Sequence, residues 1–151
     1  MRHRPVGLGI RGYQDALYLL NIQFDSEACI RFADESMEIV SYAALLGSSD
    51  LARERGAYES YRGSKWDRGI LPQDTIDILQ EERGDQIDIP RGGALDWTPV
   101  RASIKKYGMR NSNCLAVAPT ATTANIVGCV PTIEPIYKNV YVKSNQAGDF
   151  I

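Results

Sequence analysis

A run of small and hydroxyl-bearing residues, Pro119-Thr-Ala-Thr-Thr-Ala-Asn125, is the strongest candidate in the sequence for binding a ligand. It follows a short apolar segment, Asn113–Ala118, which we predict to be a strand buried on both faces, and it precedes a predicted helix. At such a junction in a parallel sheet, the free N–H groups and the positive end of the new helix attract phosphate oxygens. The threonine hydroxyls can add hydrogen bonds. An ordinary threonine-capped helix fits the same pattern, and no Gly-Lys-Ser/Thr follows that would make a Walker A loop.

A second motif, Gly7-Leu-Gly9-Ile-Arg-Gly12, matches the GxGxxG pattern of dinucleotide-binding proteins. That fold needs a hydrophobic strand before the first glycine, and here only Pro5-Val6 stands there. No βαβ unit follows either. We therefore predict that these glycines allow close backbone packing where a strand meets a helix.

The residue types used in imidazole and thiol catalysis are scarce. His3 is the only histidine, so we expect no Ser-His-Asp triad, no Cys-His dyad and no metal site. Cys29, Cys114 and Cys129 are odd in number and contain no CxxC, which indicates reduced thiols rather than a disulfide framework. No basic cluster near them would lower a thiol pKa, so we assign them no catalytic role and expect Cys114 to be a core residue.

The composition limits the classes of partner. The chain has 151 residues, a net charge of -2 and 44% hydrophobic residues, which suits one globular domain. This charge balance argues against direct nucleic-acid binding. No apolar run approaches the roughly 18 residues of a membrane span, and none follows the basic N-terminus as in a secretory signal. We expect a cytoplasmic protein.

Besides the helix after the threonine loop, four helices are predicted around these motifs. The clearest follows the turn at 24–26 and has one apolar face. We expect it to break at Gly47–Asp50, to resume over Leu51–Arg55 and to end at Gly56. The residues of its apolar face are Ile30, Ala33, Met37, Val40 and Ala44. The other helices are Gly12–Asn21, Gln73–Glu82 after Pro72, and Pro99–Tyr107 with Asp96 or Thr98 as cap.

The remaining segments connect these helices or form strands. We expect residues 57–70 to be an ordered loop and residues 83–93, with the charged run 81–91, to be solvated surface. Asn139–Lys143 alternates like a strand and precedes a turn at Gly148. Helices that lead into buried strands indicate an α/β fold.

Blocks spaced along the whole chain also carry a family resemblance. They are Arg2–Gly12, Ala57–Ser64, Gly69–Leu71, Trp97, Tyr107–Asn113, Leu115–Gly128, Ile133–Pro135 and Asn139–Ser144. In this order they resemble the large (catalytic, alpha) subunit of ribonucleotide reductase. The bacterial class I form is the nearer match and class II is a more distant second.

The resemblance implies a ten-stranded α/β barrel made of two antiparallel halves of parallel strands. Residues 1–151 would be a fragment of the second half, a partial barrel with long helices packed outside buried strands and no separate second domain. Family members are several times longer. This chain begins inside a family block and stops just after Ala147–Phe150.

The resemblance also assigns the candidate site. In the family, the Pro-Thr-Ala-Thr-type loop and its helix hold the substrate diphosphate, which implies this role for Pro119, Thr120, Ala121, Thr122 and Thr123 and favours it over a simple cap. The family's radical cysteine, redox cysteine pair and nucleotide-sensing elements would precede Met1. Its radical-relaying tyrosines and mobile cysteines would follow Ile151. We therefore expect no catalytic residue in this fragment.

The implied function is that of ribonucleoside-diphosphate reductase, an oxidoreductase that makes deoxyribonucleotides for DNA replication by radical reduction of the ribose 2′-hydroxyl. The expected partners are a ribonucleoside diphosphate, the rest of the large subunit, a small subunit that generates the radical with a metal cofactor, and thioredoxin or glutaredoxin. We expect the fragment itself to bind no cofactor and to be inactive alone. Two alternatives stay open: a non-enzymatic nucleotide-phosphate binding module that uses the same loop, and a non-functional remnant.

Overall fold

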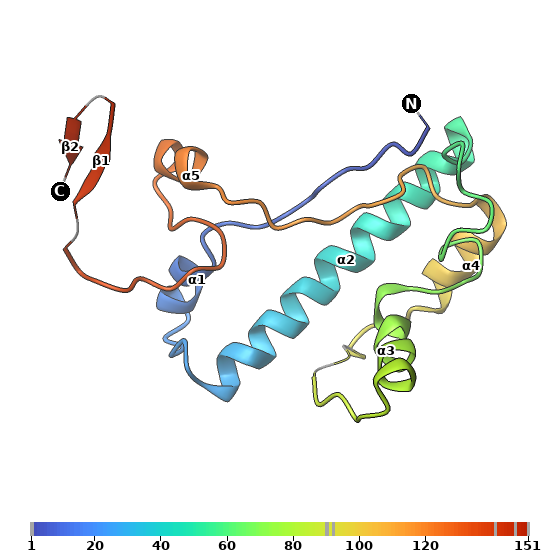
Figure 1. Ribbon diagram of the computed structural model, residues 1–151, viewed down its shortest axis with the longest axis horizontal. Coiled ribbons are helices and arrows are strands. Elements are labelled where there is room, and N and C mark those ends of the chain that lie inside the picture. The colour runs from blue at the N-terminus through green and yellow to red at the C-terminus, as the bar shows by residue number, and fades with distance from the viewer. Residues whose placement is uncertain (1, 90, 92, 141, 147, 151) are drawn as a thin grey trace. The chain divides into compact units, whose positions relative to one another are not determined.

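The computed structural model describes residues 2–89, 91, 93–140, 142–146 and 148–150, which fall into two compact units. The first unit lies within residues 1–9 and 27–118, and the second within residues 10–26 and 119–151. The first contains α2 (Glu27–Arg55), the 3₁₀ helix η1 (Pro72–Asp74), α3 (Thr75–Arg83) and α4 (Thr98–Tyr107). The second contains α1 (Tyr13–Leu19), α5 (Ala121–Val127), β1 (Lys143–Asn145) and β2 (Gly148–Phe150) (Figure 1).

The long helix α2 is continuous over 29 residues, so the predicted break at Gly47–Asp50 is wrong. Ser48 and Ser49 are buried there, and tertiary contacts hold their hydroxyls. Ser49 Oγ lies 2.8 Å from Ser103 Oγ of α4, and Ser48 Oγ donates to Asn111 Oδ1 at 3.0 Å. Packing on α4 therefore outweighs the weak helix propensity of this stretch. The helix ends before Gly56, which has φ +77° and donates its N–H to Ala52 O, as predicted.

The buried face of α2 differs from the predicted one. Ile30 is 49% exposed, and the other four predicted positions are only half-buried. The buried residues of the helix are Cys29, Glu38, Leu45, Ser48, Ser49 and Ala52. The face was misassigned because the polar residues Glu38, Ser48 and Ser49 are buried with hydrogen-bond partners, which hydrophobic periodicity does not anticipate.

The core of the first unit joins α2, α4 and the loop between α2 and η1. Its buried members are Leu45, Tyr58, Leu71, Val100, Ile104, Met109 and Cys114. The loop at 57–70 is ordered, as predicted, because Trp66 donates its indole N–H to Ser112 O at 2.8 Å and Asp67 accepts the N–H of Gly63 at 2.8 Å. The predicted core position of Cys114 is confirmed, with 7% exposure.

The three shorter helical elements of this unit, η1, α3 and α4, match the two helices predicted there closely. η1 and α3 together cover the helix predicted after Pro72, and Arg83 closes α3 rather than opening the connection. α4 begins at Thr98, and Asp96 accepts the Thr98 N–H at 2.9 Å, although the N-cap position itself is Trp97. In the connection predicted at 83–93, Pro90 and Gly92 lie outside the described residues.

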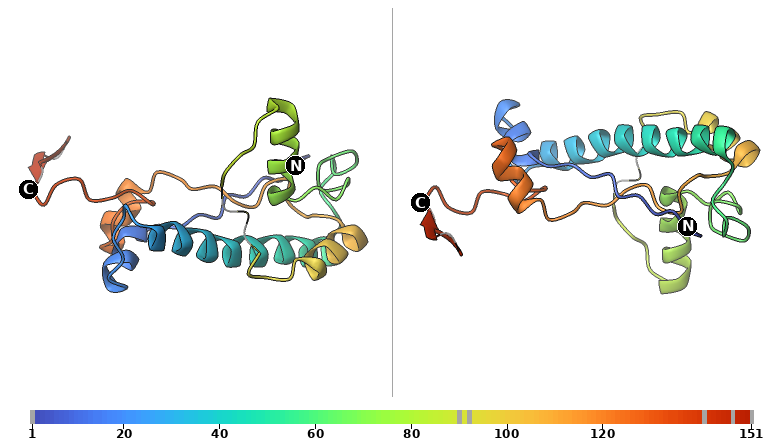
Figure 2. Two further views of the ribbon diagram at one scale, coloured as in Figure 1. Left: turned by 90° about the horizontal axis from the view of Figure 1, so that it is seen from below. Right: turned by 90° about the horizontal axis from the view of Figure 1, so that it is seen from above.

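The segment Asn113–Ala118 does not form the predicted buried strand. It pairs in parallel with residues 6–8 through Val6 N–H to Asn113 O, Leu8 N–H to Cys114 O, and Ala116 N–H to Leu8 O, at 2.9–3.0 Å. Within the described residues, Leu8–Leu115 is the single isolated bridge, and Figures 1 and 2 show the two extended segments running side by side. Leu8 and Val117 remain 48% and 46% exposed. A strand buried on both faces needs further strands and covering helices, and the described residues provide one neighbour.

The glycines of the GxGxxG motif have the predicted packing role. A Cβ at Gly9 would lie 2.3 Å from Ala116 O, and one at Gly7 would lie 2.9 Å from the Ala116 Cβ. Gly12 has φ +75° and stands at the N-cap of α1. The first two glycines thus allow the parallel pairing, and the third supplies a left-handed turn into the helix.

In the second unit, the strand predicted at Asn139–Lys143 is displaced toward the C-terminus. β1 and β2 form an antiparallel hairpin with Lys143 opposite Phe150 and Ser144 opposite Asp149. Gly148 belongs to β2 rather than to the turn. Tyr141 and Ala147, which fall in the predicted strand and in the family block, lie outside the described residues. The described parts of the chain therefore mix helices with little strand and form no barrel, so the predicted half-barrel is not confirmed. No described helix is long and apolar enough to cross a membrane.

Candidate functional site

The threonine loop, Pro119–Thr123, lies in the second unit and leads into α5. Thr120 is the N-cap and Ala121 the first helical residue. Ala124 is completely buried and fixes one side of the helix. The helix ends at Gly128, with φ +78°, whose N–H donates to Ala124 O at 2.8 Å. Proline before the helix and glycine after it delimit α5. The predicted helix after the loop is therefore confirmed.

The start of α5 has unused backbone donors. Its first intrahelical hydrogen bond runs from Ala124 N–H to Thr120 O, at 2.7 Å. The N–H groups of Ala121, Thr122 and Thr123 have no hydrogen-bond partner among the described residues. These three residues are exposed, and the first turn carries no acidic side chain. Three free donors in a first turn that carries no acidic side chain are suited to an anion.

The three threonine hydroxyls are not equivalent, contrary to what the sequence suggests. Thr120 Oγ1 accepts the N–H of Thr132 at 2.9 Å. Thr123 Oγ1 donates to Thr120 O at 3.2 Å, so its hydrogen is already engaged. The hydroxyl of Thr122 is exposed and has no partner within the described chain. Thr122 is consequently the hydroxyl most available to a ligand.

The neighbouring segment 128–132 and α1 support the loop (Figure 1). The helix predicted over Gly12–Asn21 is confirmed as α1 (Tyr13–Leu19), but its supporting role was not predicted. Val130 donates its N–H to Asp15 Oδ2 at 2.7 Å and accepts the N–H of Gly12 at 2.9 Å. Thr132 is 6% exposed and has φ +48°. An acidic residue in the first turn of a helix interacts favourably with the helix dipole wherever it stands, so the sequence position of Asp15 carries no sign of this role, and nothing local marks Thr132.

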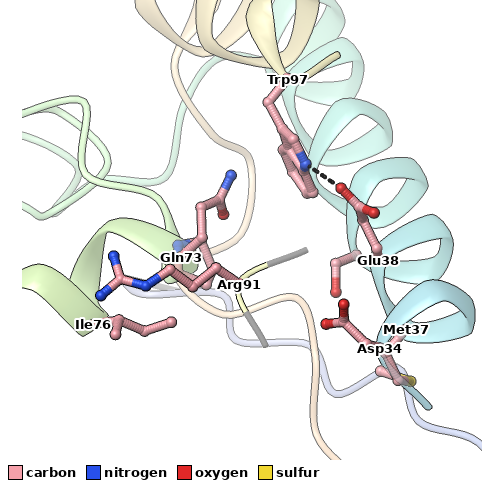
Figure 3. Close-up of a pocket in the computed structure, with 9 residues that line it drawn as sticks. Asp34, Met37, Glu38, Gln73, Ile76, Arg91 and Trp97 are labelled. Atoms are coloured by element: carbon pink, nitrogen blue, oxygen red, sulfur yellow. Dashed lines mark hydrogen bonds between the residues drawn. The ribbon is translucent and has the colours of Figure 1, made fainter. Parts of the chain in front are cut away.

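A hollow in the first unit contains a second group of polar side chains. It lies between α2, η1, α3 and the 91–97 segment, and its polar residues include Asp34, Glu38, Gln73 and Arg91 (Figure 3). Arg91 contacts Asp77 and donates to Gln80 Oε1 at 2.6 Å, which fixes it on α3. No residue of the threonine loop lines this hollow.

Glu38 is the buried acid of this hollow. Its Oε1 accepts the indole N–H of Trp97 at 2.8 Å, the contact drawn in Figure 3. The carboxylate also accepts the backbone N–H groups of Gly93, Ala94 and Leu95 at 2.9, 3.0 and 3.3 Å. The Trp97 bond and then the Gly93 bond lower the pKa of Glu38 below its ordinary value. A carboxylate so occupied is a structural anchor rather than a general base.

The three cysteines and the histidine differ in burial. Burial raises the pKa of the Cys114 thiol, against a smaller opposing effect of a hydrogen bond with Ser48. Cys29 is buried on α2 and Cys129 is half-buried. His3 is exposed, with its Nδ1 2.5 Å from Ser60 Oγ. Among the residues described, no three or more His, Cys, Asp or Glu side chains could together hold a metal ion.

Comparison with known proteins gives a consistent family. The family model "Ribonucleotide reductase, barrel domain" matches residues 1–151. The chain is 55% identical over 151 residues to the ribonucleoside-diphosphate reductase subunit alpha of Chlamydia pneumoniae, covering 99% of this chain and 14% of that protein. It is 39% identical to the ribonucleoside-diphosphate reductase large chain of Neurospora crassa and 36% identical to the large subunit of vaccinia virus, with 99% of this chain covered in each case.

The chain spans 14%, 15% and 18% of the lengths of these three relatives. The matched region nevertheless includes the threonine loop, its helix and the GxGxxG motif at Gly7–Gly12. Because the family model matches every residue from 1 to 151, the chain belongs to the ribonucleotide reductase barrel domain family.

Proposed function

We propose that this chain is part of a ribonucleoside-diphosphate reductase large subunit and that its threonine loop binds the diphosphate of the ribonucleoside diphosphate substrate. Family membership supports the first statement. The observation that carries the second is the exposed start of α5, where three neighbouring N–H groups have no partner among the described residues.

The loop binds by hydrogen bonding alone. The N–H groups of Ala121, Thr122 and Thr123 and the hydroxyls of Thr120 and Thr122 donate to phosphate oxygens. Each hydrogen bond to a charged acceptor contributes roughly 1.5–3 kcal/mol. Two or three such bonds hold the diphosphate and fix the direction in which the ribose extends from it. The contribution of this chain to the reaction is thus binding and orientation.

The rest of the chemistry belongs to other parts of the enzyme. The reaction replaces the ribose 2′-hydroxyl by hydrogen and releases water, and a dithiol supplies the two electrons. We propose a radical-generating small subunit with a metal cofactor, the remainder of the large subunit, and thioredoxin or glutaredoxin as partners in the cytoplasm. No group of this chain is assigned a proton- or electron-transfer step.

We also propose that residues 6–8 and 113–117 are adjacent strands of an α/β barrel that other segments of the large subunit complete. Their parallel pairing through three hydrogen bonds supports this. So does their apolar exposure, since Val6, Leu8 and Val117 are between 46% and 53% exposed. A parallel sheet buries such residues beneath helices on both faces.

The test of diphosphate binding is calorimetric titration of the 151-residue chain with a ribonucleoside diphosphate and with its parent nucleoside. We expect the diphosphate to bind more tightly, and we expect Thr122→Val together with Thr123→Val to weaken its binding about tenfold, the loss of one charge-assisted hydrogen bond. Most of this loss should come from Thr122→Val. Ala121→Asp should weaken binding further, because it places a carboxylate beside the phosphates.

The matched control is Thr98→Val, which removes an exposed hydroxyl from the first turn of α4. It should leave diphosphate affinity unchanged. If the diphosphate binds no more tightly than the nucleoside, or if the Thr122/Thr123 double variant binds it as tightly as the original chain, the threonine loop is only a helix cap.

A further inference from the structure

Both backbone polar groups of Val130 are bonded to the start of α1. Its carbonyl accepts the Gly12 N–H at 2.9 Å, and its N–H donates to Asp15 Oδ2 at 2.7 Å. Gly12 is closely packed here, since a Cβ on it would lie 3.3 Å from Asp15 Oδ2 and 3.5 Å from the Cys129 Cβ. These bonds fix the position of the segment that runs from α5 to Thr132.

Thr132, two residues further, is held in an unfavourable conformation. Its φ of +48° lies in the left-handed region, which a β-branched residue rarely adopts. The residue is 6% exposed, its carbonyl accepts the Tyr13 N–H at 3.4 Å, and its N–H donates to Thr120 Oγ1 at 2.9 Å. A backbone in such a conformation persists only where its surroundings determine it. Here the surroundings are the bonds to α1 on one side and to the threonine loop on the other.

The Thr132 bond determines what the Thr120 hydroxyl can do. A threonine hydroxyl has one hydrogen to donate and two lone pairs to accept. Because the Thr132 N–H occupies one lone pair of Thr120 Oγ1, the hydroxyl hydrogen of Thr120 points away from Thr132 and remains available as a donor. Phosphate oxygens accept hydrogen bonds, so this is the state of Thr120 that suits the proposed ligand.

We infer that Asp15 is a positioning residue for the threonine loop: by fixing Val130, it places the Thr132 N–H where it orients the Thr120 hydroxyl. The inference rests on the proposed function, because it takes the diphosphate as the ligand of Thr120. Asp15 acts here through the position of its oxygen. A negative charge in the same unit does not itself favour a phosphate.

Position and charge can be separated by three variants in the 151-residue chain, titrated calorimetrically with a ribonucleoside diphosphate. Asp15→Ala removes the acceptor, and we expect about fivefold weaker binding, the loss of roughly one neutral hydrogen bond. Asp15→Asn keeps an oxygen acceptor without the charge and should bind within about twofold of the original. Asp15→Glu keeps the charge but displaces the oxygen by one methylene, and should weaken binding as Asp15→Ala does.

The control is Glu134→Ala, which removes an exposed carboxylate of the same unit and should not change affinity. A double variant tests whether Asp15 acts through Thr120: Asp15→Ala combined with Thr120→Val should bind no more weakly than Thr120→Val alone. The inference is overturned if the losses of diphosphate affinity in Asp15→Ala and Thr120→Val add up in the double variant. It is also overturned if Asp15→Asn and Asp15→Glu bind the diphosphate equally well. The Asn and Glu variants decide the matter by themselves if Asp15→Ala does not fold.

The amide proton resonance of Thr132 separates this inference from the proposed function. We expect the resonance to shift in Asp15→Ala and in Thr120→Val and to stay in place in Glu134→Ala, whether or not a ligand is present. If the original chain binds no diphosphate, the proposed function fails and the resonance alone tests the positional link. An unmoved Thr132 resonance in Asp15→Ala refutes the link even where diphosphate binding is confirmed.

Discussion

Replacing Glu38 by Ala should destabilise the first unit more than replacing any exposed acid of α2. Glu38 is 7% exposed, and its carboxylate accepts four hydrogen bonds from donors that follow it by 55 to 59 positions in the sequence. Gly93 and Ala94 are exposed, so water can replace the oxygen at their N–H groups. Leu95 and Trp97 are half-buried, and their donors lose a partner that water replaces poorly.

The expected magnitude follows from those two half-buried donors. An unsatisfied buried donor costs about 1–3 kcal/mol, so Glu38→Ala should lower the free energy of unfolding by about 2–4 kcal/mol. Glu38→Gln keeps one oxygen but loses the charge and turns an amide N–H₂ toward a donor. Its cost should be about 1–2 kcal/mol.

The same bonds make stability depend on pH in a defined direction. Hydrogen bonds hold the pKa of folded Glu38 below its ordinary value of 4.5, so the unfolded chain binds more protons in that region. The contribution of Glu38 is therefore fully present above about pH 4.5 and is lost as the pH falls through the folded-state pKa. The Gln side chain of Glu38→Gln cannot titrate, so the difference in the free energy of unfolding between this variant and the original chain should become smaller as the pH falls.

Urea unfolding, followed by circular dichroism and tryptophan fluorescence from pH 7 to pH 3, measures both effects. Glu35→Gln is the control, because Glu35 is exposed on the same helix. It should change stability by less than about 0.5 kcal/mol. The reasoning is refuted if Glu38→Gln has the same free energy of unfolding as the original chain at pH 7. It is also refuted if the difference between the two chains stays constant from pH 7 to pH 3.

Two further predictions concern glycine packing and thiol reactivity. Gly9→Ala should destabilise the first unit by about 2 kcal/mol or more, because its Cβ would meet Ala116 O. Gly47→Ala, in open space on α2, should stabilise the unit by about 0.5–1 kcal/mol. Thermal unfolding of both variants is the test, and equal shifts of their melting temperatures would contradict the prediction. Cys114 should react with iodoacetamide more slowly than Cys129, because burial shields its thiol and raises its pKa; mass spectrometry of partly labelled protein decides, and earlier labelling of Cys114 contradicts it.

The sequence predicted most of the helices because their signals are local. Gly56 ends α2 in a left-handed conformation, and Pro72 opens the η1–α3 segment. Proline restricts the backbone, and glycine permits positive φ, wherever they stand in a chain. For the same reason the presence of a helix directly after the threonine loop followed from the order of residues, although its end at Gly128 was not predicted.

The strands did not follow from the sequence in the same way. The apolar run 113–118 predicts burial on both faces, but burial depends on segments that lie elsewhere in the sequence. In the described structure that run has residues 6–8 as its single neighbour. An apolar pattern states that a segment can be buried, and only its neighbours in space determine whether it is.

In the candidate site too, the sequence predicted one part and the tertiary structure decided another. Its residue types identified Pro119–Thr123 as a phosphate candidate, yet they could not rank the hydroxyls of the loop. That ranking depends on Thr132 reaching Thr120 and on Asp15 fixing Val130 across 115 positions of the chain. In the sequence, Glu38 cannot be distinguished from the other acidic residues of α2. It becomes a structural anchor only because residues 93–97 fold against it and donate hydrogen bonds to its carboxylate. Such hydrogen bonds join groups that are distant in sequence, and they exist only once the backbone between them has folded, so only the tertiary structure decides them.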